Sequence, residues 1–183
     1  MYNCIISILQ FGVVWLYHVV YYLFLEWSTL GFSTYICLVL SWQMSTILSF
    51  HTGYDEGTNR SSRNIASTAG VIFSPTNEFV YSGGIFLGHA TNNIAKYEAV
   101  IALMTRESTL GIRSLVVCLD SELIISQLTS HYSVCNLVLY HKYLRARLLE
   151  WSFDSISYEH VPREFNTLAH SLANEVLDWH FSH

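Results

Sequence analysis

The sequence predicts an α/β domain over residues 44–180. Strand-like and helix-like segments alternate along this region, and a hairpin pattern precedes its first helix. A short apolar run, "SLVVCLD" at 114–120, follows that helix. Runs of this kind are typical of central parallel strands, which are covered on both faces. The three observations together favour a sheet that mixes antiparallel and parallel strands.

The first three predicted strands all lie before the first helix. The run "STILSFH" (45–51) is rich in β-forming residues, and the polar loop "TGYDEGTNRSSRN" follows it. Two more strands are predicted in "TAGVIFSP" (68–75) and "EFVYSGGIFLG" (78–88). The residues "SPTNE" between them are turn formers, so these two strands are expected to form an antiparallel hairpin.

The first helix follows the hairpin and ends near Gly111, a residue that favours a helix C-terminus. Its apolar residues recur at the spacing of one buried helical stripe: Ile94, Tyr97, Ile101 and Met104. Asn92 or Asn93 suits the N-cap, where a short polar side chain accepts hydrogen bonds from free backbone N–H groups. Lys96 lies in the first turn, where the helix dipole favours an anion over a cation.

The remaining elements continue the alternation. They are the strand at 114–120, a short helix from Ser121, a longer helix at 137–151, a strand at 153–161 and a final helix at 163–179. Asp120 ends the buried strand, at the carboxyl edge where open α/β sheets bind ligands. Capping of the next helix is the alternative role for Asp120.

Composition divides the chain into two parts. It is 51% hydrophobic, and the first 50 residues contain no Lys or Arg and one acid, Glu26. The run 4–25 is long enough to cross a bilayer as a helix, so residues 1–43 are predicted as a hydrophobic N-terminal segment with a candidate membrane span. The alternative is a buried stretch or an extension without a membrane role. The net charge of −5 argues against a strongly basic nucleic-acid binder, and the four cysteines form no C-x-x-C pair.

Three motifs, in order, resemble the ribonuclease H type-1 domain, in the branch found in plant retroelements: "TNNIAKYEAVIALM", "LVVCLDSELIISQL" and "YEHVPREFNTLAHSLAN". The resemblance implies a five-stranded mixed sheet, with strands one to three antiparallel, flanked by helices. It also implies endonucleolytic cleavage of RNA in RNA–DNA hybrids with Mg²⁺. The implied location is nuclear or cytoplasmic, or a membrane if 4–25 inserts, and no protein partner is predicted.

The resemblance also implies four metal-binding carboxylates, of which this sequence retains one, Asp120. The first-strand Asp position is assigned to His51, the first-helix Glu position to Lys96 and the last-helix Asp position to His170. Mg²⁺ requires oxygen ligands, and a lysine adds a cation where metal ions would bind. Catalysis is therefore predicted to be impaired or lost.

Other positions carry roles from the same resemblance. Asp55 is an alternative for the first-strand carboxylate and would then bind metal with Asp120. His160 matches a loop histidine that assists turnover, although in a site without metal ions a strand-end or surface histidine is the favoured reading. Asn92 and Asn93 match residues that contact the minor groove of the hybrid, with helix capping as their alternative. Asn166 matches a further polar position in the nucleic-acid-binding pattern.

Several functions remain open from the sequence. The first is a ribonuclease H domain with impaired or lost activity, and the alternatives are a non-catalytic nucleic-acid-binding remnant and a membrane-anchored protein of unknown role. A metal-dependent nuclease that uses Asp55 and Asp120 is a further reading. So is a transition-metal site of His51, Asp120 and His170. Three bases on the helix at 137–151 suit either phosphate contacts or a solvated face: Lys142, Arg145 and Arg147.

Overall fold

A computed structural model describes residues 50–60 and 62–182, which belong to one compact unit, Ile47–His183. The predicted segment 1–43, with its candidate span at 4–25, lies outside the described residues, so both remain predictions. Within the described ranges, no helix is long and apolar enough to cross a membrane.

The elements follow the predicted order of three strands, a helix, a strand, two helices, a strand and a helix. They are β1 (His51–Arg60), β2 (Ile65–Phe73), β3 (Phe79–His89), α3 (Asn92–Thr109), β4 (Ser114–Leu119), α4 (Glu122–Leu128), α5 (Leu137–Glu150), β5 (Ser155–His160), the 3₁₀ turn η1 (Arg163–Phe165) and α6 (Thr167–Ser182).

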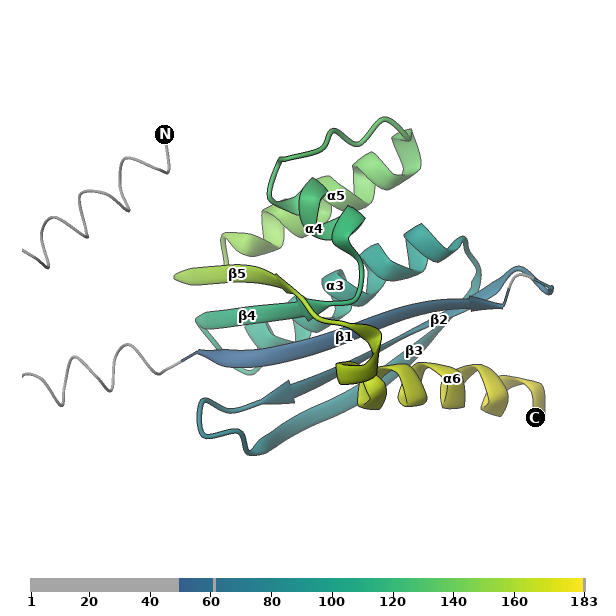
Figure 1. The fold of residues 1–183 in the computed structure, drawn as a ribbon, viewed down its shortest axis with the longest axis horizontal. Helices are drawn as coiled ribbons and strands as arrows, with labels where there is room; N and C mark the ends of the chain where they lie inside the picture. Colours follow the sequence, from purple (N-terminus) through teal and green to yellow (C-terminus); the bar gives the residue numbers. More distant parts are fainter. Residues whose placement is uncertain (1–49, 61, 183) are drawn as a thin grey trace, which may run out of the picture. The chain divides into compact units, whose positions relative to one another are not determined.

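The five strands form one mixed sheet in the order β3-β2-β1-β4-β5 (Figure 1). β1 pairs antiparallel with β2, and β2 pairs antiparallel with β3. β4 pairs in parallel with both β1 and β5. The predicted five-stranded mixed sheet, with strands one to three antiparallel, is confirmed.

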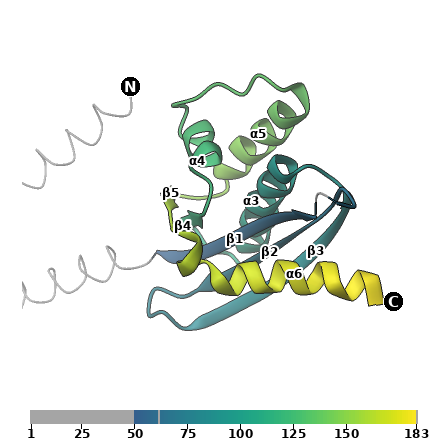
Figure 2. The ribbon, with the colours of Figure 1, turned by 45° about the vertical axis from the view of Figure 1, so that its right-hand side comes forward.

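Helices cover both faces of this sheet. α3 packs on β1 and β2 with α5 against it, whereas α6 crosses β1, β2 and β3 on the opposite face (Figure 2). The main core lies between the sheet and α3, α4 and α5. Its largest fully buried apolar side chains include Tyr97, Ile101, Met104, Leu115, Leu119, Ile124 and Leu128.

The first strand runs much further than the sequence predicts. A strand is predicted over 45–51, of which 45–49 lie outside the described residues, and a polar loop is predicted after it. The structure instead has β1 running through that loop, from His51 to Arg60. The backbone of this segment pairs with β2 from Thr52 to Arg60 and with β4 from His51 to Tyr54. Because two neighbouring strands supply its hydrogen bonds, the segment needs no alternating apolar pattern of its own.

β1 approaches α3 closely at one glycine. A Cβ atom on Gly57 would lie 2.3 Å from the carbonyl carbon of Ala95 and from the backbone nitrogen of Lys96. Only glycine fits at this contact, because real Cβ atoms do not approach the backbone so closely. The contact fixes the start of α3, and with it Lys96, over the middle of β1.

The N-cap of the first helix lies one residue before the predicted cap. Thr91, not Asn92 or Asn93, is the N-cap, and its hydroxyl accepts a hydrogen bond from the Ile94 N–H at 3.4 Å. Asn92 and Asn93 are the first two helical residues. Lys96 therefore lies in the second turn, past the end where the dipole acts most strongly.

Candidate functional site

The candidate site lies where β1 and β4 run side by side toward the start of α6. Asp120 follows the last residue of β4, as predicted. The parallel register pairs Tyr54 with Cys118, and its continuation by two residues brings Glu56 level with Asp120. β1 therefore places the carboxylate of Glu56 at this edge of the sheet.

His51 does not reach the site. It pairs with Leu115 at the start of the parallel ladder, five residues before Glu56. At about 3.3 Å per strand residue, this separation is roughly 16 Å. The assignment of His51 to the first-strand carboxylate position is therefore corrected to Glu56. The transition-metal site of His51, Asp120 and His170 is excluded by the same distance.

Glu56 is buried between the sheet and the start of α6. Its Oε1 lies 3.8 Å from His170 Nδ1, and its Oε2 accepts a long hydrogen bond from Asn166 Nδ2 at 3.5 Å. Burial raises the pKa of Glu56 to about 7, with Lys96 and Arg163 opposing the rise and Asp120 adding to it. The cations beside it keep this pKa lower than burial alone would.

Lys96 lies between the acids of the site. Its ammonium donates a hydrogen bond to Asp120 Oδ1, and both side chains are largely buried. An ion pair shielded from water is stronger than one on the surface. The carboxylate of Asp120 thus has a fixed cation as its partner.

His170 occupies the first turn of α6. The backbone N–H of His170 donates a hydrogen bond to the Asn166 carbonyl at 3.0 Å. The Arg163 guanidinium lies 3.2 Å from its ring nitrogens, and Asn174 Nδ2 lies 3.2 Å from its Nε2. Burial lowers the pKa of His170, and the charges of Arg163 and Lys96 lower it further against Asp120. Burial and the two neighbouring cations therefore favour the neutral ring.

The residues present do not fit a pair of Mg²⁺ ions. Lys96 and Arg163 lie beside the carboxyl groups of Glu56 and Asp120, so cations of the protein already surround both acids. Mg²⁺ needs oxygen ligands in near-octahedral geometry, and an ammonium ion supplies none. Within residues 50–60 and 62–182, no group of three or more His, Cys, Asp or Glu side chains is arranged to hold a metal ion.

Asp55 points to the opposite face of β1 from Glu56. Side chains alternate along a strand, so Asp55 shares the face of Gly57, which packs on α3. It is buried there, and its Oδ2 has no hydrogen-bond partner among the described residues. Burial raises its pKa well above the usual range. The prediction that Asp55 binds metal beside Asp120 is corrected, because Glu56 faces that side.

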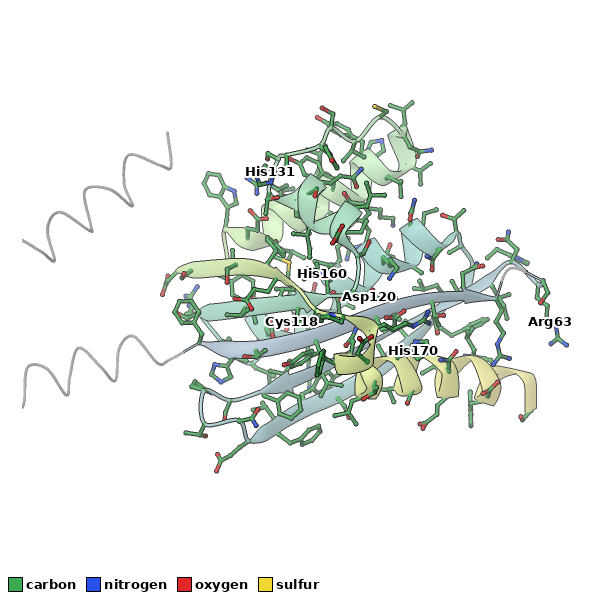
Figure 3. All side chains as sticks on the ribbon, viewed as in Figure 1. Arg63, Cys118, Asp120, His131, His160 and His170 are labelled. Carbon is green, nitrogen blue, oxygen red and sulfur yellow. The ribbon has the colours of Figure 1, made fainter. Side chains whose placement is uncertain are left out.

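His160 ends β5, next to β4, and pairs in register with Leu119. Figure 3 shows it on one side of Asp120, with His170 on the other. Its Nδ1 lies 4.0 Å from the Glu122 carboxylate, and both side chains are exposed. His160 thus lies at the rim, where a loop histidine and a strand-end histidine remain equally compatible with its position.

The three asparagines have different environments. Asn166 is 1% exposed, and its Nδ2 donates to the Asp55 carbonyl at 2.7 Å. A side chain so enclosed holds β1 against α6 and does not contact a hybrid, which corrects its predicted binding role. Asn92 is exposed and Asn93 half-buried at the start of α3, and neither is the cap. Both therefore stay available for binding.

The bases of the helix at 137–151 are mostly engaged within the domain. Lys142 pairs with Glu98, which points away from the site toward α5. Arg147 donates to Glu150 and to the Leu128 carbonyl at 3.0 Å. These contacts favour a structural role over phosphate binding for both residues.

Glu56 is the site residue that sequence reasoning missed. The visible signal is the acid directly before a glycine, Glu56-Gly57, in a segment that lacks strand alternation. Glu56 stands where the family pattern has an Asp, whereas His51 follows an apolar strand-like run that resembles the end of the family's first strand. The close packing of Gly57 on α3 identifies the right register.

Comparisons with known proteins identify the family of this chain. The family model described as "Reverse transcriptase-like" matches residues 54–176, beginning two residues before Glu56. The curated ribonuclease HI of Halobacterium salinarum is 38% identical over 125 residues, which is 68% of this chain and 63% of that protein. The chain thus spans less than two thirds of that relative's length.

Solved structures give the same result. The crystal structure of RNase H1 from Halobacterium salinarum superposes with a TM-score of 0.68 and 37% identity, over 70% of this chain and 97% of that chain. LC11-RNase H1, isolated from compost and solved with an RNA/DNA hybrid, matches with a TM-score of 0.68 and 26% identity. That match covers 72% of this chain and 99% of the other.

Proposed function

Because this chain belongs to the reverse transcriptase-like family of ribonuclease H domains, we propose that it binds RNA–DNA hybrids without metal-dependent cleavage of the RNA strand. The retroelement origin of the domain is part of the proposal. It is supported by the three quoted motifs and by the description of the matching family.

The single observation that carries the proposal is the ion pair between Lys96 and Asp120. The only acid assigned to the family's metal set by sequence is held by an ammonium ion, and Glu56 lies beside the same pair. To admit a divalent cation, the site would have to displace a partly buried ion pair, which costs several kcal/mol. Cleavage that depends on metal ions is therefore not expected.

Binding needs none of the missing acids. Lys96 neutralises Asp120, and the exposed Arg163 adds positive charge at an edge where Glu56 and Asp120 alone would repel a phosphate. Cations that contact phosphates supply most of the affinity for nucleic acid, independently of base sequence. Asn92 and Asn93 offer amide groups at the start of α3, suited to the accessible minor groove of an A-like duplex.

Fluorescence anisotropy with a labelled RNA–DNA hybrid tests the proposal on the full chain. The affinity is expected to be equal in EDTA and in Mg²⁺, and the RNA strand is expected to stay intact. Asn92→Ala with Asn93→Ala is expected to weaken binding roughly tenfold, about 1.4 kcal/mol. The control is Thr76→Ala, in the exposed turn between β2 and β3.

Two results would overturn the proposal. One is RNA cleavage by the parent chain in Mg²⁺ that Asp120→Asn abolishes. The other is the absence of measurable binding of the hybrid by the parent chain.

A further inference from the structure

The outer face of α5 carries a row of exposed apolar side chains. Among the residues of α5 and its C-cap Trp151, only Ala146 is fully buried. Five large side chains on the other side, called here the α5 stripe, are exposed by 76, 42, 39, 71 and 89%: Leu137, Tyr140, Leu144, Leu148 and Trp151. Single exposed apolar residues are ordinary, but a contiguous row of this length marks an interaction surface.

The stripe is narrow and straight. At 3.6 residues per turn, its five positions fall within about 80° of the helix circumference. None of the five is charged. The nearby cations are largely neutralised within the domain, since Lys142 pairs with Glu98 and Arg147 with Glu150. Docking on this face therefore leaves those two ion pairs in place.

The order of the stripe residues is symmetric about Leu144. Leu137 and Trp151 lie seven residues before and after it, and Tyr140 and Leu148 lie four before and four after. A two-fold axis through Leu144 would therefore place each stripe residue opposite another stripe residue in an antiparallel copy. Isologous dimer interfaces require this self-complementarity, in which residue i meets j and j meets i.

We infer that the α5 stripe is the interface with a second copy of this chain, joined by antiparallel α5 helices around a two-fold axis at Leu144. The exposed parts of the five side chains cover roughly 600 Å² on each protomer, so a pair would bury about 1,200 Å², the lower limit for a stable interface. In this arrangement Leu137 packs on the partner's Trp151, and Tyr140 packs on the partner's Leu148.

The inference does not depend on the proposed function. α5 covers the face of the sheet opposite α6, and no stripe residue contributes a contact to Glu56, Asp120 or Lys96. Hybrid binding and self-association can therefore each be lost without the other.

Site-specific disulfide formation in the full chain tests the inference. It reports which residues face each other across the interface as well as whether two chains associate. The background carries Cys4→Ser, Cys37→Ser and Cys135→Ser, and it keeps Cys118, which is buried. Leu144→Cys, on the two-fold axis, is expected to link with its own copy under mild oxidation. Leu137→Cys and Trp151→Cys are each expected to stay unlinked alone and to link when mixed. In the antiparallel pair, equivalent positions at either end are about 21 Å apart, beyond disulfide reach.

Sedimentation of a charged variant provides the second measurement. Leu144→Arg places two like charges on the axis and is expected to shift the chain to monomer, with its circular dichroism unchanged because the site is exposed. Ile85→Arg, which replaces an exposed apolar residue on β3, is the matched control and is expected to leave the dimer intact. A monomeric parent chain would overturn the inference, and so would links that form at Leu137→Cys alone as readily as in the mixture.

Discussion

The double variant Lys96→Glu with His170→Asp is expected to cleave the RNA strand of an RNA–DNA hybrid in Mg²⁺, at least roughly a hundredfold faster than the parent chain. The two substitutions remove the ammonium ion beside Asp120 and add two carboxylates around Glu56 and Asp120. Four acids would then meet at the edge between β1, β4, α3 and α6. Carboxylate oxygens are the ligands Mg²⁺ prefers.

The controls for this experiment follow from the register. Asp120→Asn added to the double variant is expected to abolish the gained activity. His51→Asp added to it is expected to change nothing, because His51 pairs with Leu115 far from the site. If the gain in activity appears only when His51→Asp is present, the assignment of Glu56 to the first-strand position is incorrect.

Glu107→Leu is expected to stabilise the domain by about 3 kcal/mol at pH 7. Glu107 is fully buried on α3, and neither of its carboxylate oxygens has a hydrogen-bond partner among the described residues. Burial raises its pKa from 4.5 to about 9. The folded state keeps this carboxyl protonated at pH 7, whereas in the unfolded chain its pKa is 4.5. The difference costs about 1.4 kcal/mol for each pH unit between 4.5 and 7, or about 3 kcal/mol in total.

The sign of the pH dependence follows from the same shift. Below pH 4.5 the carboxyl is protonated in both states and costs nothing through ionisation. Between pH 4.5 and about 9 the folded state binds the proton that the unfolded state releases, so stability falls as pH rises. Above about 9 the loss is complete. Glu107→Leu is expected to make this slope shallower, with Asp55 supplying part of what remains.

Urea unfolding at pH 5, 7 and 9 measures both effects. Glu107→Gln is the isosteric control, which removes the titration without adding apolar contacts. Glu175→Gln is the control at an exposed acid on α6. Equal free energies of unfolding for the parent and Glu107→Leu at pH 9 would show that the buried carboxyl is not a source of instability.

The sequence predicts the order of the elements and the sheet, because apolar periodicity and turn residues carry that information locally. The Ser74–Glu78 turn illustrates this: Asn77 adopts φ 62°, and backbone bonds close the turn between β2 and β3. The course of β1 could not be predicted in the same way. Its segment from Thr52 to Arg60 is polar, and its parallel partner β4, which pairs Cys118 with Tyr54, lies far along the chain.

The candidate site was predicted only in part for the same reason. Asp120, Lys96 and His170 lie in segments with clear local patterns, and the structure brings them together. Glu56 lies in the segment whose register depends on tertiary pairing with β4, so the local sequence pattern points to His51 instead. Burial of Asn166 also depends on tertiary packing, between β1 and α6. The residues next to Asn166 in the sequence do not indicate this burial.

Binding of Mn²⁺ to the parent chain, followed by electron paramagnetic resonance of the free ion, tests most directly whether Lys96 takes the place of a metal ion. The parent is expected to leave the free-ion signal unchanged across a titration. Lys96→Glu adds a carboxylate, the kind of ligand such ions prefer, and is expected to lower the signal at the same concentrations. Tight binding by the parent that disappears in Asp120→Asn would contradict the account, because the site would then hold a metal ion despite the ammonium beside it.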